Sequence, residues 1–479
     1  MAKDPRFDVH LNAEFDAPPS EVSSSDAFRI AILGNFSGRA GQPGSPSLDR
    51  RRVWRVDRDD LDMVIAGIAP ELRIAIDPSE PPVVVRFSTL DDFHPDALVE
   101  RVPIFQQLRA LRGAPAPQTL PSPQPRPAAG AARTDALLSG GSLLDQIVGN
   151  DPGSTSADEP LRIAPRDELT EFVDRAVRPH TIREASRDER ALSAKVDEVI
   201  AATMRVLLHH PEFQALESLW RAVDLLVRRL DTGESLQIAL VDVGRAELQA
   251  DLEVGAPALQ RLLGQGRWSL VVSAYSFGPD DVQVLAKLAA LGQSSGASWI
   301  VGGDPRLAGT PAFSGEADPD DWEIPVPAGW DALRRSPGAS HLSVVLPRFL
   351  VRLPYGARTD ACSFPFEEML PGKPDHASYL WGNGAMLGAL AIGDAVAEGD
   401  EPATQATLSG FPLHVVHVDG DVIATPCTEA LITHRAVAYM VDRGLTPLAS
   451  PRDGDTILIP RLQSVASPAR PLSFPRGSA

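Results

Sequence analysis

The chain has 479 residues, enough for about three domains at roughly 150 residues each. Its 45 Lys and Arg residues stand against 64 Asp and Glu residues, and the formal net charge of −19 disfavours nucleic acid as a partner. Hydrophobic residues make up 43% of the chain, which excludes a wholly disordered protein. Two cysteines, Cys362 and Cys427, are too few for a disulfide framework and match no zinc motif.

Neither a signal peptide nor a membrane span is predicted. The first residues, MAKDPRFDVH, contain no apolar core, and the most apolar stretch, which begins at Ala385, is short and interrupted by Asp394. We therefore expect a cytoplasmic, multidomain protein without membrane insertion.

The N-terminal residues 1–27 predict an arm strand followed by a tether. Phe7, Val9 and Leu11 alternate with polar residues in the period-2 pattern of a strand, and the sequence PPSEVSSSD follows. A lone amphipathic strand on a tether needs a partner that is distant in the chain or in another chain. A disordered N-terminus is the alternative.

Residues 28–112 predict one small α/β domain. Strands are expected at 28–33, 71–76 and 83–87, with helices over 59–68 and from 96 to about 111. A Gly-rich turn, GNFSGRAG, follows the first strand. It lacks the Lys and Ser or Thr of a phosphate-binding loop, so a plain turn is the better interpretation.

Residues 113–160 predict a linker. Six prolines between 113 and 132 indicate an extended, solvated tether. A short apolar segment, SLLDQIVG, follows within the linker and contains Leu143, Leu144 and Ile147.

Residues 161–466 predict a larger mixed α/β domain. A pair of amphipathic helices comes first, and Pro211 is expected in the first turn of the second helix, after His209 and His210. A βαβαβ pattern follows, with strands at 235–243, 268–275 and 298–303. Helices are expected over 247–263 and over 280–291, the latter capped by Gly292. This order favours a mainly parallel sheet covered on both faces. Residues 467–479 read as a polar tail.

The sequence offers little for catalysis or cofactor binding. The turn after the strand at 235–243 has no GxGxxG motif, which argues against a dinucleotide site. His414 and His417 lie three apart in a predicted strand, so their side chains point to opposite faces and cannot share a metal.

Carboxylates at two places in the sequence are candidates for an enzyme function. Adjacent Glu367 and Glu368 diverge and cannot act as a paired acid and base without a third group. One of the two histidines before Pro211 is expected to cap a helix or face solvent. Asp304 follows a strand where an α/β enzyme would place an acid, but a lone acid there is more often a turn residue. An α/β enzyme is therefore only a remote alternative, and no cofactor is expected.

Several segments, in order, resemble the contractile sheath of the type VI secretion system. FRIAILGNFSGR and the region from Val83 resemble its small subunit, TssB or VipA. Segments that begin at Leu208, Arg352, Phe364, Tyr379 and Pro426 are similar to its large subunit, TssC or VipB. The most recognisable segment, LHHPEFQALESLWRAVDLLV, carries the motif residues His210, Pro211, Phe213, Gln214, Glu217, Trp220 and Arg221.

The resemblance implies a natural fusion of the two sheath subunits, joined by the proline-rich linker. In that family, the N-terminal strand of the small subunit interlocks neighbouring protomers through shared sheets, and the strand at 7–15 matches its position. The resemblance also implies an inner tube protein, a baseplate and an ATP-driven unfoldase of the ClpV type as partners. Residues 142–149 lie where the unfoldase-recognition helix is expected.

The large subunit of the family extends beyond the point that corresponds to Ala479, into a further core portion and an arm strand. We therefore weigh two functions besides the enzyme. The first is a non-catalytic sheath subunit that self-assembles around the tube and acts by conformational change. The second is a sheath-like adaptor or end-piece that docks on a sheath or baseplate without polymerising.

Overall fold

The structure is a computed structural model that describes residues 27–40, 46–76, 81–112, 187–264, 267–370, 372, 375–418 and 421–474. The predicted arm strand with Phe7, Val9 and Leu11 and the apolar segment with Leu143, Leu144 and Ile147 lie outside these residues. So does the linker at 113–160. Within the described residues, no helix combines the length and apolar character needed to cross a membrane.

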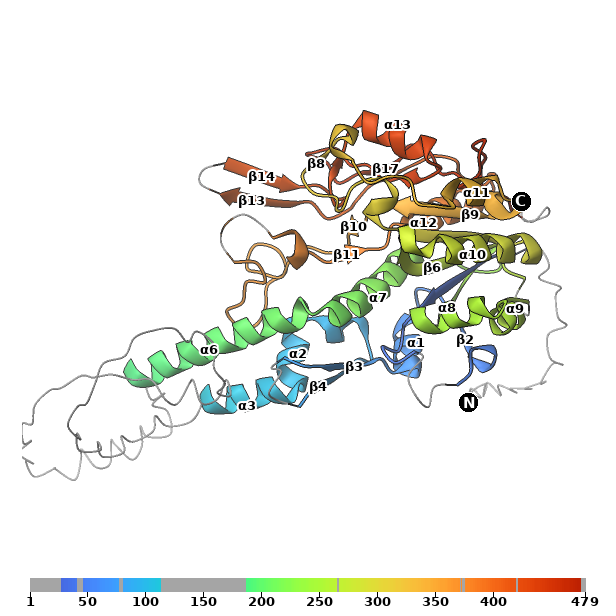
Figure 1. The fold of residues 1–479 in the computed structure, drawn as a ribbon. Coiled ribbons are helices and arrows are strands. Elements are labelled where there is room, and N and C mark those ends of the chain that lie inside the picture. Colours follow the sequence, from blue (N-terminus) through green and yellow to red (C-terminus); the bar gives the residue numbers. More distant parts are fainter. Residues whose placement is uncertain are drawn as a thin grey trace, which may run out of the picture.

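A seven-stranded sheet forms the centre of the fold, in the order β16-β9-β7-β6-β1-β5-β2 (Figure 1). Every neighbouring pair is parallel except β2 with β5. The prediction of a mixed α/β fold with a mainly parallel sheet is thus confirmed. Its strands are β1 (Phe28–Gly34), β2 (Val53–Val56), β5 (Leu236–Asp242), β6 (Leu270–Phe277), β7 (Ser298–Gly303), β9 (Leu342–Leu346) and β16 (Thr446–Pro447).

Strand β1 lies in the middle of this sheet although it comes from the N-terminal part of the chain. Phe28 pairs with Leu236 in β5, and Ile30 also pairs with Leu270 in β6. The sequence FRIAILG is apolar on both faces, as expected of a strand that is covered on both sides. The segment 28–112 is therefore not an independent packing unit, because two of its strands complete the sheet of the larger part.

Helices cover both faces of the sheet. Ile30 and Ile32 face a core shared with α7 (Pro211–Arg229) and α12 (Ala385–Ala397). Ala31 and Leu33 face the opposite core. That second core is formed with α8 (Arg245–Glu253), α9 (Pro257–Gly264), α10 (Val282–Ser295), α11 (Trp330–Arg335) and α13 (His434–Asp442). The apolar stretch at 385–397 is thus a buried helix of the core.

Three predicted helices have different bounds in the structure. The helix expected from 96 to 111 is two, α2 (Pro95–Arg101) and α3 (Pro103–Arg112), because proline cannot continue a helix from the preceding turn. The helix expected over 247–263 is likewise divided into α8 and α9, with Gly255 and Ala256 at positive φ before Pro257.

The helix α10 does not end at Gly292 as expected. It continues to Ser295, and Gly296 is the left-handed C-cap, with φ of 76°. Gly292 lies inside the helix, and its backbone packs closely on Trp299. A Cβ atom at this position would come within 3.0 Å of the indole Cδ1. A close approach therefore explains this glycine, and a cap does not.

The rest of the N-terminal part packs near the long helix α6 (Arg187–Leu208), near α7 and beside strand β2. It consists of α1 (Leu61–Ile68), the antiparallel pair β3 (Glu71–Ile74) and β4 (Val83–Arg86), and the helices α2 and α3. Helix α3 lies along α6 (Figure 1).

Small two-stranded sheets complete the C-terminal part. They are formed by β8 (Glu316–Ala317) with β15 (Leu431–Ile432), β10 (Phe349–Leu350) with β11 (Trp381–Gly382), β12 (Ala406–Leu408) with β17 (Ile457–Ile459), and β13 (His414–Val418) with β14 (Asp421–Thr425). The β13–β14 hairpin projects from the body of the protein (Figure 1). Of the residues expected as a polar tail, 467–471 are exposed, whereas Leu472 is buried and packs on the body. The ring of Phe474 lies 5.8 Å from that of Phe28.

Candidate functional site

The motif residues begin at the junction between α6 and α7. His210 is the N-cap of α7, and its Nδ1 accepts a hydrogen bond of 3.3 Å from the backbone N–H of Glu212. Pro211 occupies the first turn, where its missing N–H costs nothing. The expectation that one of the two histidines caps a helix is confirmed.

The apolar motif residues of α7 bind the N-terminal part of the chain. Trp220 is fully buried, as its helical face predicts, and its Nε1 donates to the carbonyl of Phe36 at 3.2 Å. The rings of these two residues lie 5.1 Å apart. Phe213 packs edge-on against Phe87 and Phe93. This face of α7 therefore joins the two portions of the chain.

A buried ionic cluster occupies another side of α7. We define it by Glu217, Arg221, Arg352, Tyr355 and Glu368. Glu217 is fully buried and accepts hydrogen bonds of 2.7 Å from Nε of both Arg221 and Arg352. Arg352 also donates to Glu368, with its Nη1 2.7 Å from Oε2. The cluster thus connects α7 to the segment of Arg352 and Tyr355, more than 130 residues away in the chain, and through Arg352 to Glu368.

Within the ionic cluster, Glu368 and Arg352 are both charged at neutral pH. Burial alone would raise the pKa of Glu368, but the charge of Arg352, the nearby His209 and hydrogen bonds from Arg352 and the backbone of Tyr355 lower it to about 2. Burial also disfavours the charged form of Arg352, yet the two carboxylates hold its pKa well above the usual value. Burial raises the pKa of Tyr355 as well.

This cluster suits a structural role. Both glutamates accept hydrogen bonds from other groups of the protein, and the arginine charges neutralise them inside the fold. Glu367 and Glu368 diverge as expected, since Oε1 of Glu367 accepts from the backbone N–H of Ala357 at 3.1 Å. Asp304 also behaves as the expected turn residue. It caps a short 3-10 helix and pairs with Arg306.

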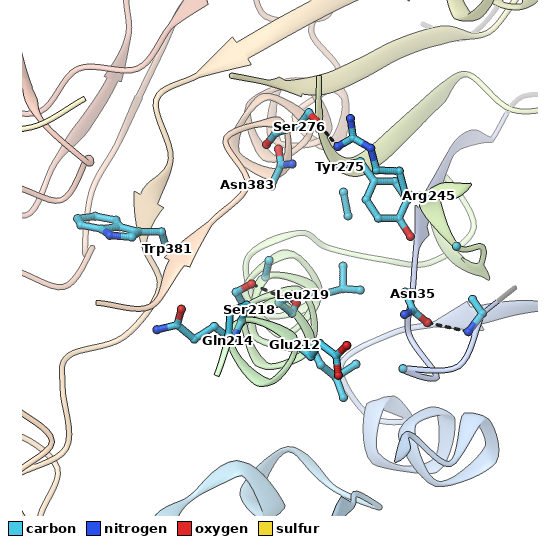
Figure 2. A pocket seen from close by; sticks show the side chains of 18 of the residues that line it. Asn35, Glu212, Gln214, Ser218, Leu219, Arg245, Tyr275, Ser276, Trp381 and Asn383 are labelled. Atoms are coloured by element: carbon cyan, nitrogen blue, oxygen red, sulfur yellow. Dashed lines mark hydrogen bonds between the residues drawn. The ribbon is translucent and has the colours of Figure 1, made fainter. Parts of the chain in front are cut away.

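A cavity of about 1020 Å³ lies at the carboxyl ends of β1, β5 and β6 (Figure 2). One side of α7 forms a wall of this cavity, with Gln214 and Ser218. Parallel α/β sheets commonly bind ligands at this edge. Polar groups here bond to the protein itself. Tyr275 Oη donates to the carbonyl of Val243 at 2.5 Å, and Arg245 donates to Ser276 at 2.6 Å.

The loop after β1 lines this cavity. The turn after β1 places Gly38 at φ of 70°. The side chain of Asn35 accepts a hydrogen bond from the N–H of Ala40, so these polar groups of the loop are paired with each other. Among the described residues, no group of three or more His, Cys, Asp and Glu side chains is placed to hold a metal ion.

The β13–β14 hairpin is the second surface of interest. Its strands pair with each other, and no third strand pairs with them in the described part of the chain. Val415 is 46% exposed and Val422 is 63% exposed. An exposed strand edge with apolar side chains is a template for another strand. The sequence placed His414 and His417 on a strand, which β13 confirms, but the hairpin itself was not predicted.

The comparisons with known proteins agree with this two-part architecture. The family model for the VipB or EvpB tail sheath N-terminal domain matches residues 190–466. The model for VipA of the type VI secretion system matches residues 2–116. The fold and these two regions define a sheath protein of the type VI secretion system. The chain belongs to the VipB tail-sheath family and carries a VipA region in the same polypeptide, as a fusion of the two subunits.

One relative supports the same assignment. The chain is 28% identical over 339 residues to the type VI secretion system sheath protein TssC1 of Pseudomonas aeruginosa. The alignment covers 63% of this chain and 68% of TssC1.

Proposed function

We propose that this chain is a non-catalytic structural subunit of a type VI secretion sheath, which acts in the cytoplasm by assembling with copies of itself or with other sheath subunits. The observation that carries the proposal is the shared sheet, in which β1 of the VipA region lies between β5 and β6 of the VipB region. One chain thus supplies both contributions to a sheet that separate subunits would otherwise form together.

The β13–β14 hairpin is the proposed receiving surface. Its outer edges carry backbone donors and acceptors that no third described strand uses, and its exposed valines offer an apolar face. The predicted strand with Phe7, Val9 and Leu11 supplies matching alternation, and its tether of about ten residues could span some 30 Å. Strand addition between copies would then link protomers.

Contraction and the remaining partners follow from the family. Sheath action would be a switch between two packings of rigid protomers, and the strand linkages would keep neighbours connected during the change. The inner tube, the baseplate and a ClpV-type unfoldase are proposed partners, with Leu143, Leu144 and Ile147 as the unfoldase-recognition segment. No feature of the described residues favours the adaptor or end-piece alternative.

Deletion of residues 1–16 tests the proposal. We expect the shortened chain to lose or weaken assembly, seen by electron microscopy and sedimentation, while the melting temperature of the monomer stays nearly unchanged. Assembly at the level of the intact chain would contradict the proposal, and so would a loss of monomer stability.

A substitution in the hairpin tests the receiving surface separately. Val422→Lys should weaken assembly because it places a charge on the exposed apolar face. Val254→Lys is the matched control, since Val254 is 73% exposed and follows helix α8, outside the hairpin. Equal effects of the two substitutions would show that the hairpin has no special role.

A further inference from the structure

The base of the β13–β14 hairpin is held by one hydroxyl group from outside the hairpin. His414 and Thr425 form the cross-strand pair nearest the body. The Oη atom of Tyr379 lies 2.7 Å from Nδ1 of His414 and 2.8 Å from Oγ1 of Thr425. A single side chain therefore bonds to both strands at once.

Tyr379 is itself held firmly by the body of the protein. It is 3% exposed, and its ring lies 5.5 Å from that of Trp381 in β11. The indole Nε1 of Trp381 donates to the carbonyl of His376 at 2.9 Å, and the two rings stack. Burial raises the pKa of Tyr379 to about 12, so the hydroxyl keeps its proton and can donate at physiological pH.

Few hydrogen bonds attach the hairpin to the body of the protein. Within the described residues, the two bonds to Tyr379 are the hydrogen bonds that join β13 and β14 to the remainder of the fold. The strands beyond the first pair carry the exposed Val415 and Val422. Because an isolated two-stranded hairpin is marginally stable in water, its order depends on how its base is held.

We propose that Tyr379 is a positioning residue that fixes the hairpin at one angle to the body and keeps its edge ordered for an incoming strand. The inference rests on the proposed function, because the incoming strand is that of another sheath chain. Ordering the edge in advance lowers the entropic cost of pairing. Without the hydroxyl, the hairpin would sample many angles and pair more weakly.

Hydrogen exchange of the full chain, at a concentration below assembly, tests this role directly. Tyr379→Phe should raise amide exchange across residues 414–425 about tenfold and leave the central sheet unchanged. Tyr275→Phe is the matched control, because it also removes a partly buried tyrosine hydrogen bond, to Val243, but from strand β6. It should leave exchange in the hairpin at the level of the unmodified chain.

Thr425 separates a positioning role from a general effect on stability. Thr425→Ser keeps the hydroxyl and should retain slow exchange, whereas Thr425→Val removes one of the two bonds and should raise exchange less than Tyr379→Phe does. Equal hairpin exchange in the two tyrosine variants would overturn the proposal. A rise spread evenly over the sheet would overturn it too.

The consequence for pairing is measured with the same proteins at assembling concentrations. Tyr379→Phe should lower the affinity between chains about tenfold, and Tyr275→Phe should not. Unchanged affinity in Tyr379→Phe would overturn the proposed positioning role. If the unmodified chain fails to associate at all, the proposed function is wrong, while hydrogen exchange still decides whether Tyr379 orders the hairpin.

Discussion

Replacing Arg352 by Met tests the ionic cluster most severely. Arg352 is the cation between two buried carboxylates, with 11% of its side chain exposed. Removing it leaves Glu368 with the backbone of Tyr355 and His209 as partners, and Glu217 with Arg221. Breaking a buried pair typically costs about 3–5 kcal/mol, because a charge stays buried without its partner. We expect a loss of this size in the free energy of unfolding.

The pH dependence of this loss follows from the pKa of Glu368. A fall from the ordinary 4.5 to about 2 corresponds to about 3 kcal/mol, at about 1.4 kcal/mol for each pH unit. This stability is fully present above pH 4.5, where the carboxyl is ionised in both the folded and the unfolded state; between pH 4.5 and 2 the unfolded state binds a proton that the folded state does not. It is lost as the pH falls from 4.5 towards 2. The difference between Arg352→Met and the unmodified chain should therefore be largest near pH 7 and shrink below pH 4.5.

Urea denaturation followed by tryptophan fluorescence, at pH 7 and at pH 4, measures both effects. The control is Arg435→Met, because Arg435 is 63% exposed and pairs with Asp318 and Asp320 at the surface. Such surface pairs contribute little, because solvent screens their charges. A loss in Arg352→Met no larger than that in Arg435→Met would refute the reasoning, and so would a loss that grows as the pH falls.

Three further predictions concern packing. Trp220→Ala should cost about 3–5 kcal/mol in thermal unfolding, as truncation of a fully buried aromatic residue does, and an unchanged melting temperature would contradict its place in the core. Cutting the chain within 113–132 should leave fragments that elute together on gel filtration, because β1 lies between β5 and β6; separate elution would disprove a shared core. Gly292→Ala should lower the melting temperature, since a Cβ there would lie 2.8 Å from the carbonyl oxygen of Ala297, whereas Gly233→Ala meets nothing within 4 Å and should be nearly neutral.

Much of the fold is predictable from local patterns. The apolar runs of β1, β5, β6 and β7 mark buried strands, and the helix–strand alternation indicates a mainly parallel sheet. These patterns indicate that a strand is buried, but they do not indicate which strand lies next to it in the sheet. The run FRIAILG is equally compatible with a small sheet of its own, so the place of β1 between β5 and β6 could not be predicted.

In the candidate sites too, features within one helix are predictable and contacts between distant residues are not. The cap formed by His210 and the burial of Trp220 follow from spacing within one helix. The pairing of Glu217 with Arg352 does not, because the two residues are 135 positions apart and no local signal connects them. The hairpin was missed because its strands are short and one face is exposed, which weakens the apolar signal.

Disulfide trapping between chains tests the central claim, that a strand of one copy joins the hairpin of another. One protein would carry Val422→Cys and a second would carry a single cysteine substitution at Phe7, Val9 or Leu11. Both native cysteines, Cys362 and Cys427, would be replaced by serine in every protein.

We expect mild oxidation of the mixture to give a covalent dimer of the two proteins, with the highest yield for one of the three arm positions. Neither protein alone should give this dimer. An intramolecular disulfide in a chain that carries both substitutions, formed in dilute solution, together with no heterodimer from any mixture, would contradict strand addition between copies.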